Sequence, residues 1–236
     1  MNILDNITYW LTENSTRAFY LLFLVAFLVN RLPFIGVFFR TLNTVLHETG
    51  HAVGAMITSG EVVKIEINTD TSGLAQTKAT GKLGAIITTS MGYPFAALMS
   101  SAFLIFTMKG YHIAVAIVML SIVIIDLMLF VRNTYGILWL VLFSTMIMVT
   151  FYFGGRAMVM PLMLFASMMS FTETIASTMV ITALSFSNPR KSGDMHNLEK
   201  STGIPAALWS LVNLMVVGII IYYTIVNYFP PIKMIF

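Results

Sequence analysis

The stretch TVLHETGHAVGAM, residues 44–56, decides how the rest of the chain has to be interpreted. It places two histidines and one glutamate in a segment that otherwise has the composition of a membrane helix. Ionisable side chains are costly in hydrocarbon, and those found inside a membrane usually carry function. Two questions follow: whether the chain is a membrane protein, and what these side chains bind.

The overall composition answers the first question. The 236 residues are 58% hydrophobic and only 10% charged, and the mean hydropathy is +0.86. Soluble domains carry roughly 25% charged residues, so a soluble globular protein is excluded. The chain has no cysteine, which rules out a disulfide framework and thiolate metal ligands. Any metal site must therefore be built from His, Asp, Glu or Asn.

Apolar segments of about 20 residues, the length that crosses a bilayer, recur along the chain. We expect an all-α polytopic membrane protein with about seven transmembrane helices (six to eight), forming a single membrane-embedded domain over residues 1–236. The segments are 17–30, 34–58, 84–107, 111–131, 135–153, 157–186 and 204–228. Pro161 and Glu173 predict that the sixth helix is tilted or kinked.

Two polar regions interrupt this pattern. After the second segment, EVVKIEIN alternates polar and apolar residues, TDTSG has turn chemistry, and LAQTKAT follows. This pattern predicts a β-hairpin over about 61–80, outside the hydrocarbon. Residues 187–203 predict a polar loop before the last helix.

The distribution of lysine and arginine predicts the orientation. With seven spans, the N-terminus, the hairpin, the loop at Arg132 and the loop 187–203 share one side of the membrane, and that side carries most of the basic residues. Cytoplasmic loops are enriched in lysine and arginine. We therefore expect the N-terminus and the hairpin to face the cytoplasm.

His47 and His51 are four residues apart, which places both imidazoles on one face of a helix. With Glu48 they form the HExxH motif, in which two histidines bind zinc and the glutamate acts as general base toward a zinc-bound water. Such a motif also occurs by chance. Three ionisable groups within five residues of a membrane segment are difficult to explain by packing, which favours a site for one Zn²⁺ ion.

A catalytic zinc usually takes three protein ligands, and membrane depth restricts the choice of the third. Asp194 and His196 lie just before the last helix, on the same side as the motif. Asp126 lies at that end of the fourth helix and stays open. Glu173 is near the middle of its helix and is better interpreted as a partner for another polar group, while His112 begins a helix on the far side.

Four stretches resemble the smaller bacterial branch of the site-2 protease clan, a group of intramembrane zinc metalloproteases. LHETGHAVGAMITSGEVVKIEI (46–67) is similar to its helix-then-strand opening, and TSMGYPFAALMSS (89–101) to its Gly-Tyr helix. FVRNTYG (130–136) resembles its Arg-Asn turn, and SGDMHNLEKSTGIPAALW (192–209) its late acidic motif. The similarity covers most of residues 35–210. It implies a bacterial cytoplasmic membrane.

Carried over by position, the resemblance implies that His47, His51 and Asp194 bind zinc and that Glu48 is the catalytic base. SGDMHN differs from the Asn-Pro-Asp-Gly and Leu-Asp-Gly motifs of the larger site-2 proteases, so His196 is kept as the alternative third ligand. The implied activity is hydrolysis of a peptide bond in or near the bilayer by a metalloendopeptidase. The alternative is a non-proteolytic metal-binding scaffold or partner subunit of a membrane complex. A metal transporter fits less well, because the candidate ligands cluster at one depth.

A helical substrate hides its peptide bonds, and an exposed strand edge would pair with it in extended form. Ile65 and Ile67 are the candidate substrate-binding positions on such an edge, although a hairpin that only caps the structure explains the pattern equally simply. We expect the partners to be a membrane-protein substrate and the lipid bilayer, and no nucleic acid. A regulatory membrane partner or an oligomer stays open.

Overall fold

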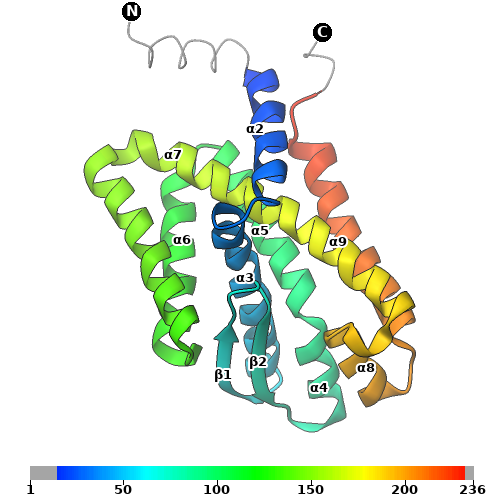
Figure 1. Ribbon diagram of the computed structural model, residues 1–236. Helices are drawn as coiled ribbons and strands as arrows, with labels where there is room; N and C mark the ends of the chain where they lie inside the picture. Colours follow the sequence, from blue (N-terminus) through cyan, green and yellow to red (C-terminus); the bar gives the residue numbers. More distant parts are fainter. Residues whose placement is uncertain (1–14, 232–236) are drawn as a thin grey trace, which may run out of the picture.

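The computed structural model describes residues 15–231, and this part of the chain is almost entirely helical (Figure 1). Its eight α-helices are α2 (Ser15–Val29), α3 (Ile35–Ile57), α4 (Gly81–Ser90), α5 (Gly92–Met108), α6 (His112–Ile125), α7 (Thr134–Ser187), α8 (Asp194–Thr202) and α9 (Ala206–Tyr228). Two short turns accompany them, the π-helical η1 (Asp126–Phe130) and the 3₁₀ turn η2 (Pro189–Lys191). The strands β1 (Glu61–Ile67) and β2 (Gly73–Lys78) form the predicted hairpin.

Three helices in the described residues are long and apolar enough to cross a membrane: α6 continued through η1, α7, and α9. Helices α4 and α5 meet at a 42° bend and make a fourth candidate if the pair is one span. Large apolar side chains such as Leu98, Leu142 and Ile219 are exposed on these helices, as expected for lipid contact. The chain is therefore an integral membrane protein.

The 54 residues of α7 contain two arms, because the backbone at Gly155 is not helical (φ 59°, ψ −164°). The chain runs along one arm, turns and returns along the other (Figure 1). The arms correspond to the predicted segments 135–153 and 157–186. The break lies at Gly155, and the backbone stays helical through Pro161. The second arm runs obliquely across the bundle (Figure 1), so of the two expected forms, tilted or kinked, the helix is tilted.

The first two helices do not form an antiparallel pair. Tyr20 on α2 donates a hydrogen bond to the carbonyl of Pro230 (2.7 Å), and the rings of Phe19 and Phe229 are 5.0 Å apart. The beginning of α2 therefore lies beside the end of α9, at the opposite end of the bundle from the hairpin (Figure 1). The expectation that the N-terminal end shares the hairpin's side is wrong for the described residues.

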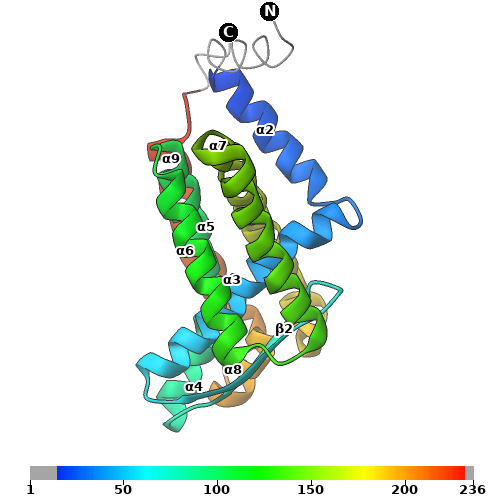
Figure 2. The same ribbon diagram turned by 90° about the vertical axis from the view of Figure 1, so that its left-hand side faces the viewer.

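Helix length gives the physical reason. Helix α2 has 15 residues and is about 22 Å long, shorter than a hydrocarbon core of about 30 Å. The break at Pro33 and Phe34 (φ 61° at Phe34) redirects the chain without reversing it. Helices α2 and α3 thus follow one another, and α3 runs obliquely across the bundle (Figure 2).

The hairpin is antiparallel, with Glu61 opposite Lys78 and Ile67 opposite Gly73. The outer edge of β1 is occupied by the segment after η1. Ile65 bridges to Val131 in parallel, and the amide of Arg132 donates to the carbonyl of Ile65 (3.1 Å). The side chain of Asn133 bonds both the N–H (3.0 Å) and the carbonyl (2.5 Å) of Ile67. Among the described residues no strand pairs with the other edge of β2.

Helix α3 lies in the centre of the main hydrophobic core. Its Leu42 and Leu46 are buried with Leu104 of α5 and with Phe143 and Phe171 from the two arms of α7. The helix thereby contacts α5, α7 and both strands, which holds the HExxH face in a fixed position.

The region 187–203 is not a loop throughout, as the sequence had suggested. It contains η2 and the helix α8, which packs on α4 and α9 through the buried side chains of Met195 and Leu198. Apolar residues three apart lie on one face of a helix, and this short pattern explains why a polar segment becomes helical here.

Candidate metal centre

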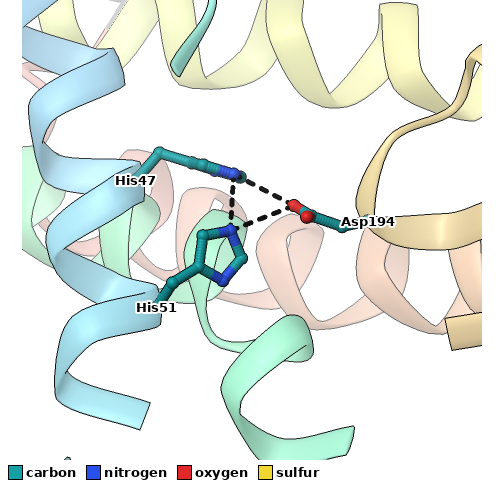
Figure 3. Close-up of side chains that lie close together, drawn as sticks. All are labelled: His47, His51 and Asp194. Atoms are coloured by element: carbon teal, nitrogen blue, oxygen red, sulfur yellow. Dashed lines mark hydrogen bonds and ion pairs between the residues drawn. The ribbon is translucent and has the colours of Figure 1, made fainter. Parts of the chain in front are cut away.

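His47 and His51 on α3 and Asp194 at the start of α8 point toward one another (Figure 3). The two Nε2 atoms are 3.0 Å apart. Oδ2 of Asp194 is 3.0 Å from Nε2 of His47 and 3.2 Å from Nε2 of His51. Three potential ligand atoms therefore form a nearly equilateral triangle. They come from two helices far apart in the sequence, α3, which ends at Ile57, and α8, which begins at Asp194.

This donor set fits a zinc ion. Tetrahedral zinc with bonds of about 2.0–2.2 Å separates its ligand atoms by about 3.3–3.5 Å, slightly more than the separations found here. Two imidazole nitrogens and one carboxylate oxygen are ligands that zinc prefers, and they leave a fourth position open. The three residues can therefore hold the metal after small outward shifts of their side chains.

The neighbouring backbone supports this geometry. Nδ1 of His51 lies 2.8 Å from the carbonyl oxygen of Thr88, which can only accept, so Nδ1 carries the proton and Nε2 is free to bind metal. The ring of Tyr93 packs edge-on against His47 with the ring centroids 4.4 Å apart. Gly92 lies directly against both imidazoles, since a Cβ there would be 2.7 Å from each Nε2 atom. These contacts leave the imidazoles little freedom.

Asp194 reaches the site because α8 begins at this residue, after Gly193 with φ 50°. Burial would raise the pKa of the Asp194 carboxyl, but the adjacent imidazoles of His51 and His47 lower it below its usual range. The carboxylate form, which is the form that binds metal, is thereby favoured.

Glu48 lies on the side of α3 that faces β2, and the residue is only 4% exposed. Its carboxyl group packs against Gly73, where a Cβ would be 2.7 Å from Cδ of Glu48, and it has a hydrogen bond with the backbone of Ala75. A larger residue than glycine at position 73 would displace the carboxylate. Glu48 is therefore held between the metal ligands and the open edge of β2.

A pocket of about 740 Å³ contains this arrangement. Its walls come from α3, β2, the α4–α5 bend, the second arm of α7, and α8. Gly73 to Thr77 of β2 form one wall, and His47, Glu48, His51 and Asp194 line the same space. Because five consecutive residues of β2 line it, the pocket has the length that an extended peptide needs to pair with the strand.

The other acidic and histidine candidates have different partners. Nδ1 of His196 is 3.2 Å from the carboxylate of Glu199 on α8 itself. Asp126 accepts a hydrogen bond from Thr49 (2.7 Å), which is on the side of α3 away from the two histidines. Glu173 accepts from Arg31 (3.1 Å). Of the candidate ligands, the structure brings together only His47, His51 and Asp194 among the described residues.

Ile65 and Ile67 do not border the pocket. Both side chains are buried, at 1% and 0% exposure, and the outer edge of their strand is already paired with residues 131–133. The strand edge that lines the pocket belongs to β2. The alternating pattern of the sequence was strongest in β1 because that strand is the more buried of the two.

Asn43 and Thr44, which precede the HExxH motif on α3, also line the pocket. Arg40, one turn earlier, donates to the carbonyl of Asn30 (2.9 Å). The supporting role of Thr88 had no signal in the sequence, because it acts through its backbone carbonyl. Gly92 belongs to the Gly-Tyr stretch that carries part of the family resemblance, but its contact with the imidazoles did not follow from the sequence.

Comparison with protein families shows that the family model described as Peptidase M50B-like matches residues 18–224. Comparison with curated proteins and with solved structures finds no match. The family match confirms the resemblance to the site-2 protease clan. It covers most of the chain and includes every residue of the cluster formed by His47, His51 and Asp194, together with Glu48. The chain belongs to the Peptidase M50B-like family of metalloproteases.

Proposed function

We propose that this protein is an intramembrane zinc endopeptidase that cleaves a peptide bond of a membrane-protein substrate, in or near the bilayer. The observation that carries this proposal is the position of Glu48. A buried carboxylate lies beside two metal-binding histidines and against an open strand edge. A site that only stabilised the fold would not need a base at this position.

His47, His51 and Asp194 would hold the ion. Zinc bound there would supply a Lewis acid that polarises the scissile carbonyl and lowers the pKa of water. Glu48 accepts the proton of the attacking water at its carboxylate and transfers it to the departing amine. The contacts with Gly73 and Ala75 hold that carboxylate in place between water and substrate.

The edge of β2 is the proposed binding surface for the substrate backbone. Ile65 directs its carbonyl to Arg132, away from β2. In an antiparallel pair, opposite residues direct their backbone groups the same way relative to the ladder, so Ala75, opposite Ile65, directs its own groups outward. An extended peptide that paired with this edge would lie in the pocket beside Glu48.

A proline at position 77 tests this pairing. Thr77 is two residues after Ala75 on the same strand, so its N–H also faces outward. Proline is tolerated at such edge positions. Thr77→Pro should therefore reduce cleavage and leave zinc content unchanged. Cleavage at the parental rate would argue for a hairpin that only caps the structure.

We also propose that the end of the bundle with the active site faces the cytoplasm of a bacterial cell. That end carries Lys64, Lys78 and Arg132 together with the basic turn η2, whereas Arg17 lies toward the other end. The positive-inside rule supports this orientation. An accessibility assay with single cysteines is straightforward, since the chain has none of its own. A cysteine in η2 should react with a membrane-impermeant thiol reagent only after the cells are permeabilised, and its labelling in intact cells would reverse the orientation.

The decisive experiment compares Glu48→Gln with Glu173→Gln. Both changes remove one carboxylate from a helix of the bundle, Glu48 being buried and Glu173 partly buried, but Glu173 pairs with Arg31 and does not line the pocket. Purified parent and both variants should contain about one zinc per chain. A co-expressed single-span membrane protein that the parent cleaves should stay intact only with Glu48→Gln. Cleavage by Glu48→Gln, or a parent without zinc, would favour the non-proteolytic scaffold.

A further inference from the structure

We propose that Asn43 is a substrate-binding residue whose side-chain amide donates a hydrogen bond to a main-chain carbonyl of the peptide in the pocket. This inference rests on the proposed peptidase function. It adds a residue that lies outside the HExxH motif and outside the metal cluster.

The position of Asn43 places it beside the metal ligands. It lies one helical turn before His47 on the same face of α3, is 6% exposed, and lines the pocket. The adjacent Thr44 donates to the carbonyl of Thr71 in the hairpin turn (2.7 Å). Asn43 therefore marks the end of the pocket at which the hairpin turn is attached to α3.

The orientation of its amide is fixed from the far side. The hydroxyl of Thr174 on α7 lies 2.7 Å from Oδ1 of Asn43 and 2.9 Å from the carbonyl oxygen of Ser170. Because Oδ1 can only accept and is the nearer of the two, the single hydroxyl proton is assigned to Asn43. Ser100 on α5 lies 3.3 Å from the same hydroxyl. Because Oδ1 faces α7, the NH₂ group must point to the other side of the planar amide. Three helices thus determine the direction of a single side chain.

No group of residues 15–231 accepts a hydrogen bond from the NH₂ group, and its nitrogen is not among the fully buried unpaired atoms, so it is open to the pocket. A donor held at the pocket wall in this way is available to a ligand that replaces water there. The group is neutral and can only donate, and its complement is a carbonyl oxygen. A main-chain carbonyl is present in every peptide, so this contact would not depend on the substrate's side chains.

The spacing indicates which carbonyl is bound. Four residues of helix rise separate Asn43 from His47 by about 6 Å along α3, and an extended peptide advances about 3.3 Å per residue. A peptide that follows β2 would place the carbonyl at Asn43 about two residues from the bond that is cleaved.

Two hydroxamates separate binding of the peptide backbone from binding of metal. Acetohydroxamate contacts little beyond the metal, whereas a peptidyl hydroxamate also carries main-chain carbonyls along the pocket. In zinc-loaded protein, Asn43→Ala should weaken the peptidyl hydroxamate about tenfold, the value of one lost hydrogen bond, and leave the affinity for acetohydroxamate unchanged. Calorimetric titration measures both without relying on turnover.

Matched threonine variants show whether the amide's orientation matters. Thr174→Val should weaken the peptidyl hydroxamate, and Thr174→Ser, which keeps the hydroxyl, should restore it. Thr178→Val is the control: Thr178 lies one turn further along α7, and its hydroxyl is buried without a partner in the described part of the chain. If Asn43→Ala fails to fold and loses both ligands, the comparison of Thr174→Val with Thr174→Ser decides whether Asn43 binds the peptide backbone.

The outcomes distinguish this inference from the proposed function. Equal binding of the peptidyl hydroxamate to parent, Asn43→Ala and Thr174→Val would overturn the role of Asn43, and so would a parallel loss of both hydroxamates in Thr174→Val. A parent that binds zinc and neither hydroxamate would overturn the peptidase function itself, and the role of Asn43 with it.

Discussion

Gly92 packs directly against both histidines of the candidate metal centre, so a small change at this position should disturb the site. It is the first residue of α5, at the bend with α4. A Cβ at this position would be 2.5 Å from Cε1 of His47 and 2.7 Å from the Nε2 atoms of His47 and His51. Ordinary contacts begin at 3.4 Å, so in Gly92→Ala both nitrogens would have to retreat by about 0.7 Å.

Such a displacement is large for a metal site. Metal–ligand distances are kept within about 0.2 Å, and the imidazole of His51 is held by its bond to Thr88 while that of His47 packs on Tyr93. We expect Gly92→Ala to lower zinc affinity at least about 100-fold, or about 2.8 kcal/mol. Helical content should stay unchanged, because alanine is a better helix former than glycine.

A competition titration with a chromophoric zinc chelator, on protein purified in detergent, measures this change. Gly84→Ala is the matched control in the neighbouring helix α4, since a Cβ at Gly84 would meet the side chain of Thr58 at ordinary distances of 3.4 and 3.5 Å. Its zinc affinity should equal that of the parent. If Gly92→Ala binds zinc within threefold of the parent, the close packing of Gly92 on the imidazoles is not what positions the ligands.

Three further predictions concern the ligands, the hairpin and the metal. Asp194→Ala should abolish stoichiometric zinc binding while His196→Ala retains it, as measured by metal analysis; the opposite result would exchange their roles. Asn133→Ala should lose both hydrogen bonds to the backbone of Ile67, lower the free energy of unfolding by about 1–3 kcal/mol, and speed hydrogen exchange in β1 without loss of zinc. Unchanged hydrogen exchange would show that these two bonds do not stabilise β1. Chelation of zinc should lower the thermal midpoint, and zinc at 100-fold above its Kd should restore about 2.7 kcal/mol; a midpoint insensitive to chelator would mean that no ion binds.

The local features of this protein could be predicted from its sequence. His47, Glu48 and His51 lie within five residues of one helix, so the period of the helix alone fixes their relative directions. The hairpin was predictable for the same reason, because alternation and turn residues act over a few positions. The apolar segments correspond to helices in the structure, although segment 84–107 is divided into α4 and α5 by a 42° bend. Of the seven expected spans, three or four of the described helices are long and apolar enough to cross a membrane.

The direction in which one helix follows another was less predictable. Pro33 marked a break between α2 and α3, but a break does not show whether the chain reverses, and here it does not. Gly155 redirects α7 with a positive φ angle, whereas the more conspicuous Pro161 is accommodated within the helix. These outcomes depend on packing against distant segments, such as the contact between Tyr20 and Pro230.

The choice between Asp194 and His196 needed both the membrane depth predicted from the sequence and the helical structure of residues 194–202. Membrane depth selected both Asp194 and His196 as residues on the side of the motif, and no argument from depth could separate two positions so close in sequence. Because residues 194–202 form a helix instead of a loop, side chains two positions apart point in nearly opposite directions. Asp194 then faces the histidines of α3, and His196 turns to Glu199. The apolar pair Met195 and Leu198 fixes this rotation by packing against Ile181 and Ala206. The packing of two buried apolar side chains thus determines which of the two candidates faces the histidines.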